Sequence, residues 1–404
     1  MSFLTLAFRP CSRTIARKPF PSGVVAARQL HQTLPCARRN KPVEIPYENP
    51  LPPVPDRGEA PDYAFVFDID GVLVHGSNPL PRAKETLEYL HDNHIPYMLL
   101  TNGGGYSEAA QVQQLNQRLR MRAFISEQQF VQSHTPFKEH ASSPHLRTVL
   151  VLGGVKENVK EVAKGYGFRN VVIPADFLKS FQGVSPFTDK SHYSQFGTKL
   201  PKNLPKVDAV LVFNDPRDWA LDIQVVVDVL LSEGGQVGTR RRVEDVIRDG
   251  HLPVYFSNPD LWWANEYQHA RLGQRAFRAA LEGVWRSITG GQELKATTIG
   301  KPHQPTYEFA EDTLTRWRAR KLKQLGAFMD HPELKRVYMV GDNPASDIAG
   351  ANSYKSPRGT DWVSVLVRTG VFREGDSDGG AKAVVDNVEE AVRWAIEEER
   401  DLKA

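Results

Sequence analysis

The sequence predicts an α/β protein with a parallel-sheet core and a second α/β domain inserted into that core. Three observations support this fold class. Apolar runs of strand length recur at residues 63–67, 95–100, 337–340 and 362–368, as expected for parallel strands that are buried on both faces. Polar motifs follow these runs directly. Between the second and third runs lies a long segment that has strand and helix patterns of its own.

Composition is that of a folded protein with a large core. The chain has 404 residues, of which 40% are hydrophobic and 25% are charged, and this length suggests two domains. No run of about 18 apolar residues occurs, so no transmembrane helix is predicted. Residues 1–43 contain eight Lys or Arg and no acidic residue, so the net charge of +3 becomes −5 for the remainder. An acidic body gives no support for nucleic-acid binding.

The basic N-terminal segment has the pattern of a mitochondrial transit peptide, which we expect over residues 1–37. On a helix, its apolar side chains lie on one face and its arginines on the opposite face (Leu4, Phe8, Cys11, Ile15; Arg9, Arg13, Arg17). The alternative is a basic tail that binds acidic partners. A Pro-rich linker follows at 38–62. This leader predicts a mitochondrial protein of the matrix.

The core elements come in the order strand, helix, strand. The strand at 63–67 ends at Asp68, a helix is expected at 81–93, and the strand at 95–100 ends at Thr101. The later strand at 337–340 ends at Gly341-Asp342. Because ligands bind at the carboxyl edge of a parallel sheet, these strand ends are expected to share one site.

The inserted segment is assigned to residues 124–298, which leaves 63–123 and 299–404 for the core. Strands are predicted in it at residues 148–152, 207–213 and 252–256, and helices follow the first two. A domain placed here would act as a lid that excludes water from the core site.

Two stretches of the insertion are predicted to be irregular, at 182–206 and 234–250. The second contains Arg240-Arg241-Arg242. We interpret this run as a solvated face; the alternative is contact with a substrate phosphate or a lipid headgroup.

The polar motifs have the residue types needed for phosphoryl transfer through an aspartate. Asp68 is the predicted nucleophile, and Asp70, two residues later, is the predicted acid and base for the leaving alcohol and for water. Only Cys11 and Cys36 are present, so the body has no thiol that could replace these carboxylates. A plain turn at 68–71 is the alternative.

Phosphate oxygens need donors and positive charge. Thr101, Asn102 and the backbone N–H groups of Gly103 and Gly104 are the predicted donors, and Lys301 is the predicted fixed charge beside the nucleophile.

A divalent cation is predicted because several acids meet at one sheet edge. Asp68, Asp342 and the backbone carbonyl of Asp70 form the hard-oxygen set that Mg²⁺ prefers. Asp347 would complete or orient this set; its alternative is a helix N-terminal acid favoured by the helix dipole.

The order of these motifs resembles the haloacid dehalogenase (HAD) superfamily, and the lid between the second and third motifs is similar to the C2 cap of subfamily IIA. A narrower resemblance is to the mitochondrial cat eye syndrome critical region protein 5 family. It rests on Thr101-Asn102-Gly103-Gly104-Gly105, Gln132-Ser133-His134-Thr135-Pro136 and Gly341-Asp342-Asn343-Pro344-Ala345-Ser346-Asp347. The motif Ser257-Asn258-Pro259-Asp260 resembles the end of the C2 cap in the broader subgroup.

The resemblance implies a Rossmann-like core and a Mg²⁺-dependent phosphatase that acts on a small phosphorylated metabolite, with a possible link to glycerophospholipid metabolism. The alternative is a catalytically silent protein of this fold that binds a phosphorylated metabolite or a lipid headgroup. Dehalogenation or phosphonate cleavage is disfavoured, because Asp70 suits an alcohol leaving group. The sequence leaves open whether the protein forms a homo-oligomer.

Other conspicuous residues are assigned to packing. His134 and His303 are interpreted as packing or hydrogen-bonding residues rather than bases. The same interpretation, packing in the core or cap, is given to four tryptophans: Trp262, Trp263, Trp285 and Trp317.

Overall fold

The computed structural model describes residues 51, 61–122, 125–188, 194–263, 267, 269, 271–324 and 333–403. The predicted transit peptide at 1–37 lies outside the described residues, as does most of the linker at 38–62. Among the helices that are described, none is long and apolar enough to cross a membrane.

The predicted parallel core is confirmed. In the described part of the chain, six strands form one sheet in the order β15-β14-β13-β1-β4-β5, and all neighbours are parallel. The strands are β1 (Tyr63–Phe67), β4 (Tyr97–Leu100), β5 (Phe130–Val131), β13 (Arg336–Gly341), β14 (Asp361–Val367) and β15 (Ala383–Val385).

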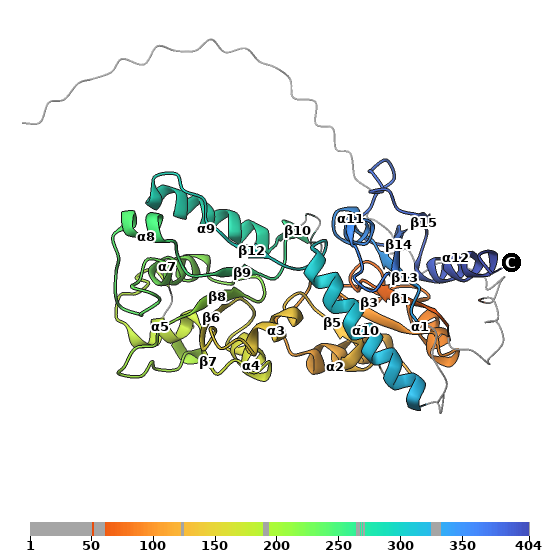
Figure 1. Cartoon of the computed structure of the whole chain (residues 1–404), viewed down its shortest axis with the longest axis horizontal. Coiled ribbons are helices and arrows are strands. Elements are labelled where there is room, and N and C mark those ends of the chain that lie inside the picture. The colour runs from red at the N-terminus through yellow and green to blue at the C-terminus, as the bar shows by residue number, and fades with distance from the viewer. Residues whose placement is uncertain are drawn as a thin grey trace, which may run out of the picture. The chain divides into compact units, whose positions relative to one another are not determined.

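Helices cover both faces of this sheet, which explains why β1 is apolar at every position. Phe65 and Phe67 pack on one face, whereas Ala64 and Val66 pack on the other, as the alternation of side chains along a strand requires. The first face is covered by α1 (Ala83–Asp92), α2 (Glu108–Leu119) and α12 (Val388–Asp401). The second is covered by α10 (Gln304–Gln324) and α11 (Ala349–Ser353) (Figure 1).

A second parallel sheet lies within the inserted segment. Its order among the described residues is β12-β9-β8-β6-β7. The strands are β6 (Thr148–Leu152), β7 (Asn170–Val172), β8 (Ala209–Val212), β9 (Val254–Phe256) and β12 (Thr297–Thr298). The helices around it are α4 (Asn158–Gly165), α5 (Pro174–Ser180), α7 (Trp219–Leu230), α8 (Val243–Asp249) and α9 (Gln274–Thr289).

Short elements connect these layers. They comprise the hairpins β2 (Val74–His75) with β3 (Asn78–Pro79) and β10 (Trp262–Trp263) with β11 (Arg271–Leu272), the short helices η1 (Glu127–Gln129), η2 (Thr135–Phe137), α3 (Lys138–Ala141) and η3 (Ser194–Phe196), and the π-helix η4 (Pro344–Ile348).

The structure differs from two expectations about the insertion. The predicted start at 124 is too early, because β5 pairs with β4 in the first sheet and the second sheet begins only at β6. The stretch 234–250 is not irregular throughout, because α8 forms in it, with Glu244 and Asp245 in its first turn, where the helix dipole favours acidic residues.

The arginine run in that stretch is bound to neighbouring acids. Arg240 pairs with Asp228 at 3.4 Å, Arg241 with Asp249 at 2.9 Å and Arg242 with Asp245 at 3.0 Å. These partners agree with a solvated face and leave no unpaired arginine in the run for a phosphate.

Candidate active site

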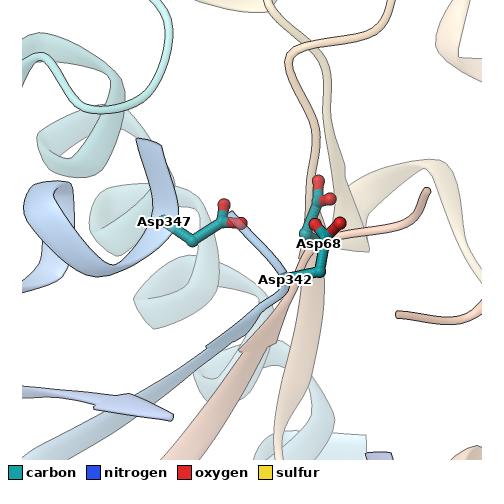
Figure 2. Close-up of side chains that lie close together, drawn as sticks. All are labelled: Asp68, Asp342 and Asp347. Atoms are coloured by element: carbon teal, nitrogen blue, oxygen red, sulfur yellow. The ribbon is translucent and has the colours of Figure 1, made fainter. Parts of the chain in front are cut away.

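Three buried aspartates meet at the carboxyl edge of the first sheet. Asp68 follows β1, Asp342 follows the neighbouring strand β13, and Asp347 lies in η4. Carboxylate oxygens of all three lie within 4.8 Å of one another. Figure 2 shows Asp68 and Asp342 side by side at the strand ends, with Asp347 pointing toward them. The strand-end aspartates that the sequence analysis expected to share one site therefore do lie together.

Lys301 provides the positive charge within this acidic cluster. Its Nζ lies 2.6 Å from Oδ1 of Asp68 and 2.7 Å from Oδ1 of Asp347, and it donates to the carbonyl of Leu100 at 2.8 Å. The side chain is only 2% exposed. One cation thus balances part of the charge of three carboxylates.

Burial, together with the charges of neighbouring carboxylates, shifts the pKa values of this cluster. Burial raises the pKa of Asp342 to about 7, with a further contribution from the charge of Asp347. Burial also raises the pKa of Asp68 well above its usual range, although Lys301 opposes this. The carboxylates overcome the burial of Lys301 and raise the pKa of its ammonium group. A site with excess negative charge and oxygen ligands fits a divalent cation such as Mg²⁺.

Two glycines allow the chain to pass close to Asp342. A Cβ atom at Gly370 would lie 1.8 Å from Oδ2 of Asp342, and one at Gly71, where φ is +87°, would lie 2.4 Å from the same oxygen. The backbone N–H of Val371 donates to this oxygen at 2.6 Å. Any side chain at either glycine would displace the carboxylate.

Asp70 lies outside the buried cluster, at the rim of the site. Its side chain is exposed, and the chain turns beside it through a hydrogen bond from Gly71 N–H to the carbonyl of Val74 at 2.7 Å. Desolvation raises the pKa of Asp70, opposed by the charges of Arg118, Lys301 and His75. A carboxyl group with a raised pKa at an open rim is suited to exchanging protons with a leaving group or with water.

Asn102 ties the strand-end loops together. Its Oδ1 accepts from Lys301 N–H at 2.8 Å, and its Nδ2 donates to the carbonyl of Lys301 at 3.0 Å and to Oδ2 of Asp260 at 3.1 Å. Its own carbonyl accepts from Nδ2 of Asn258 at 3.0 Å. Both side-chain N–H groups of Asn102 are occupied, so in this arrangement the predicted phosphate donor has no free side-chain N–H.

The other predicted donors follow β4. Thr101 is buried, and Gly103 and Gly104 follow it in an accessible loop. The N–H of Gly103 donates to Oγ1 of Thr101 at 3.0 Å. Because that oxygen already accepts one hydrogen bond, the Thr101 hydroxyl can donate its own proton to a ligand. The sequence predicted these residues at the site but not the hydrogen bond between them.

His134 holds the glycine loop in place. Its Nε2 accepts from Gly105 N–H at 3.0 Å and its Nδ1 lies 2.8 Å from the hydroxyl of Tyr166, which donates to Glu108 at 2.6 Å. Burial lowers the pKa of His134 to about 4. The interpretation of His134 as a hydrogen-bonding residue is therefore confirmed, whereas Tyr166 and Glu108 were not singled out from the sequence.

Two family profiles and several known proteins match this chain. A family profile described as haloacid dehalogenase-like hydrolase matches residues 65–169, and a second, HAD-hydrolase-like, matches residues 298–391. A mitochondrial hydrolase of Saccharomyces cerevisiae is 40% identical over 350 residues, covering 83% of this chain and 95% of that protein. The chain belongs to the HAD-like hydrolase family.

Two further relatives of this HAD-like hydrolase are informative. A cardiolipin synthase (CMP-forming) and mitochondrial hydrolase fusion protein of Schizosaccharomyces pombe is 40% identical over 340 residues, which cover 83% of this chain and 53% of that protein. The solved p-nitrophenyl phosphatase of Archaeoglobus fulgidus shares the fold, with a TM-score of 0.52, 17% identity, and coverage of 82% of this chain and 98% of that chain.

Two site residues of the HAD-like hydrolase come from the inserted segment. Asn258 and Asp260 follow β9 and reach Asn102, which follows β4 of the first sheet. Burial raises the pKa of Asp260 to about 6. The sequence marks Ser257-Asn258-Pro259-Asp260 only through its family resemblance. Nothing in the local sequence indicates that these residues contact Asn102, which lies more than 150 residues away.

The tryptophans divide into two pairs. Trp285 and Trp317 are 2% and 9% exposed, which confirms their predicted packing role. The prediction is wrong for Trp262 and Trp263, which are 56% and 45% exposed; in the part of the chain that the structure describes, β10 pairs with β11 alone. His303 is also exposed.

Proposed function

We propose that this HAD-like hydrolase is a Mg²⁺-dependent phosphatase that hydrolyses a phosphomonoester of a small metabolite in mitochondria through an aspartyl-phosphate. The observation that carries the proposal is the ion pair of Lys301 with Asp68 inside a cluster of three buried carboxylates. This arrangement combines a nucleophile with fixed positive charge, as phosphoryl transfer requires.

In the proposed steps Asp68 is the nucleophile and Asp70 is the general acid and base. A carboxylate oxygen of Asp68 forms a bond to phosphorus while the bond from phosphorus to the alcohol oxygen breaks, and Asp70 gives its proton to that oxygen. Asp70 then takes a proton from water, whose oxygen attacks phosphorus and releases inorganic phosphate and free Asp68. Thr101 would donate to a phosphoryl oxygen, and Lys301 would supply the fixed positive charge beside the nucleophile throughout.

Asp68, Asp342 and the carbonyl of Asp70 would hold the Mg²⁺. The carboxylate of Asp347 is occupied by Lys301 and by the N–H of Asn343 at 3.1 Å, which favours an orienting role behind the metal ligands. A bound Mg²⁺ supplies charge neutralisation for the phosphoryl group.

The relatives support the location and the metabolic setting. One is named a mitochondrial hydrolase, and the other joins such a hydrolase to a cardiolipin synthase in one chain. Because fused enzymes often act on connected metabolites, the fusion supports a substrate from glycerophospholipid metabolism. The predicted transit peptide supports a location in the mitochondrial matrix.

A panel of phosphate esters tests the proposal. Purified mature protein should release inorganic phosphate from at least one ester with Mg²⁺ and none with EDTA, and Asp68→Asn should lower the rate by at least about 10³-fold. Full activity in Asp68→Asn would disprove the aspartyl-phosphate route. Ligand binding without turnover across the panel would instead favour the catalytically silent alternative.

A further inference from the structure

A large pocket opens directly beside the acidic cluster. Its wall near the cluster contains Pro302, which follows Lys301, Asn343, which follows Asp342, and Val371, which donates to Asp342. From there it extends along β10 and α9 with a volume of about 1270 Å³. Pockets for small ligands usually measure about 300–1,000 Å³. Space therefore remains for a substantial group beyond the phosphate.

The charges on the pocket wall are unevenly paired. The two acidic residues both have partners, since Glu282 accepts from Nε of Arg278 at 2.7 Å and Asp260 accepts from Asn102 at 3.1 Å. Arg275 is exposed and has no carboxylate partner among the residues that the structure describes. The guanidinium group of Arg275 is therefore available to an anionic ligand in the pocket.

Arg278 is held in a fixed orientation on the same helix. Besides Glu282 it donates from Nη1 to Oγ1 of Thr298, and its guanidinium lies 5.4 Å from the centre of the Phe256 ring. Within the described part of the chain its Nη2 has no partner. A rigid guanidinium with free N–H groups is a preformed site for an anion.

Trp262 and Trp263 form the apolar side of the pocket, and about half of each side chain is exposed. Nε1 of Trp263 donates to the carbonyl of Leu272 at 3.3 Å, which fixes this ring at the hairpin. Exposed tryptophans beside guanidinium groups that keep unused N–H donors are typical of a binding surface rather than of packing.

We propose that this pocket, the leaving-group pocket, binds the alcohol part of the substrate, and that the substrate is a phosphomonoester carrying a second anionic group there, bound by Arg275 and Arg278. The inference rests on the proposed phosphatase function, because it requires the phosphate to lie at Asp68. The apolar part of the leaving group lies against Trp262 and Trp263.

Two substrates that differ only in the second anion test this assignment: phenyl phosphate and 4-carboxyphenyl phosphate. Their kcat/KM values are measured with Mg²⁺ for the wild type, Arg275→Gln, Arg278→Lys and the control Arg286→Gln. Arg286 is an exposed arginine on the same helix outside the pocket. Thermal unfolding confirms that each variant is folded.

The wild type should prefer the carboxylated ester by about tenfold, the value of one charge-assisted hydrogen bond. Arg275→Gln should lose this preference, and the control Arg286→Gln should keep it. Hydrolysis of both esters without preference, or a preference that survives in both pocket variants, overturns the inference and leaves the phosphatase intact. No phosphate release from any ester overturns the phosphatase itself.

Discussion

Gly105 donates its backbone N–H to Nε2 of His134 at 3.0 Å, so this nitrogen carries no proton. The proton of the neutral ring therefore lies on Nδ1 and points to the hydroxyl of Tyr166, which donates in turn to Glu108. Gly105 lies in the glycine loop after β4 of the first sheet, and Tyr166 follows α4, a helix beside the second sheet. A single tautomer of His134 thus connects the glycine loop to the inserted segment.

Because the fold requires a neutral His134 ring, the protein should lose stability in mild acid. Burial lowers the pKa of His134 from 6.5 to about 4, so between these values the unfolded chain binds a proton that the folded protein does not. The free energy of unfolding should fall by about 3 kcal/mol as pH drops from 6.5 to 4. Urea unfolding at several pH values measures this slope, and His134→Gln should remove His134's share of it. An unchanged slope in the variant would contradict the prediction.

The buried carboxyl group of Asp222 should make the free energy of unfolding fall as pH rises toward 8. Burial raises the pKa of Asp222, in the first turn of α7, to about 8, and the charge of Asp218 adds to this. The folded protein keeps this proton between about pH 4 and 8 while the unfolded chain loses it, so stability falls as pH rises. Asp222→Asn should therefore raise the free energy of unfolding at pH 7 to 8 and change it little near pH 4. An equal gain at both pH values would refute this account.

Removing the buried cation should destabilise the site. Lys301→Met leaves Asp68 and Asp347 without their ion pairs, which costs about 3–5 kcal/mol when one partner of a buried pair is lost. If a divalent cation binds the same carboxylates, Mg²⁺ should reduce this loss. Denaturant unfolding with EDTA and with Mg²⁺ measures both values. An equal loss in the two conditions would argue against metal binding at the acidic cluster.

Asp70 should matter most for poor leaving groups. Without the general acid, an alkyl phosphate must lose an alkoxide, so Asp70→Asn should slow its hydrolysis by about 10²–10⁴-fold. p-Nitrophenyl phosphate releases an acidic phenol that needs little protonation, and its rate should change much less. The ratio of the two kcat/KM values is the measurement, and equal losses would exclude Asp70 as the acid. Asp70 is exposed, so the variant should fold normally.

The parts of the site predicted from sequence are those marked by local pattern. Asp68 and Asp342 could be placed because each directly follows an apolar strand, and β1 and β13 are neighbours in the sheet. The strand predicted at 148–152 has the same bounds as β6. In these cases burial on both faces produces an uninterrupted apolar run, which the sequence displays directly.

Features that depend on distant partners could not be predicted in this way. β5 has only two residues and is recognisable as a strand only through its pairing with β4. Trp262 is exposed on a hairpin that joins neither of the two large sheets among the described residues, which composition does not reveal. The hydrogen bonds of Asn102 with Asn258 and Asp260 join loops that follow strands of two different sheets, and no spacing in the sequence encodes them.

The last strand of the insertion ends two residues before Gly300-Lys301. β12 pairs with β9 at Thr297 and Thr298, and the N–H of Ile299 donates to the carbonyl of Phe256 at 2.9 Å, so the second sheet extends almost to the lysine. The position of the central charge is consequently fixed from both sides, by the carboxylates of the core and by the strand that ends the insertion. A shortened enzyme made by excising the insertion would lose one of these two supports of its reaction centre.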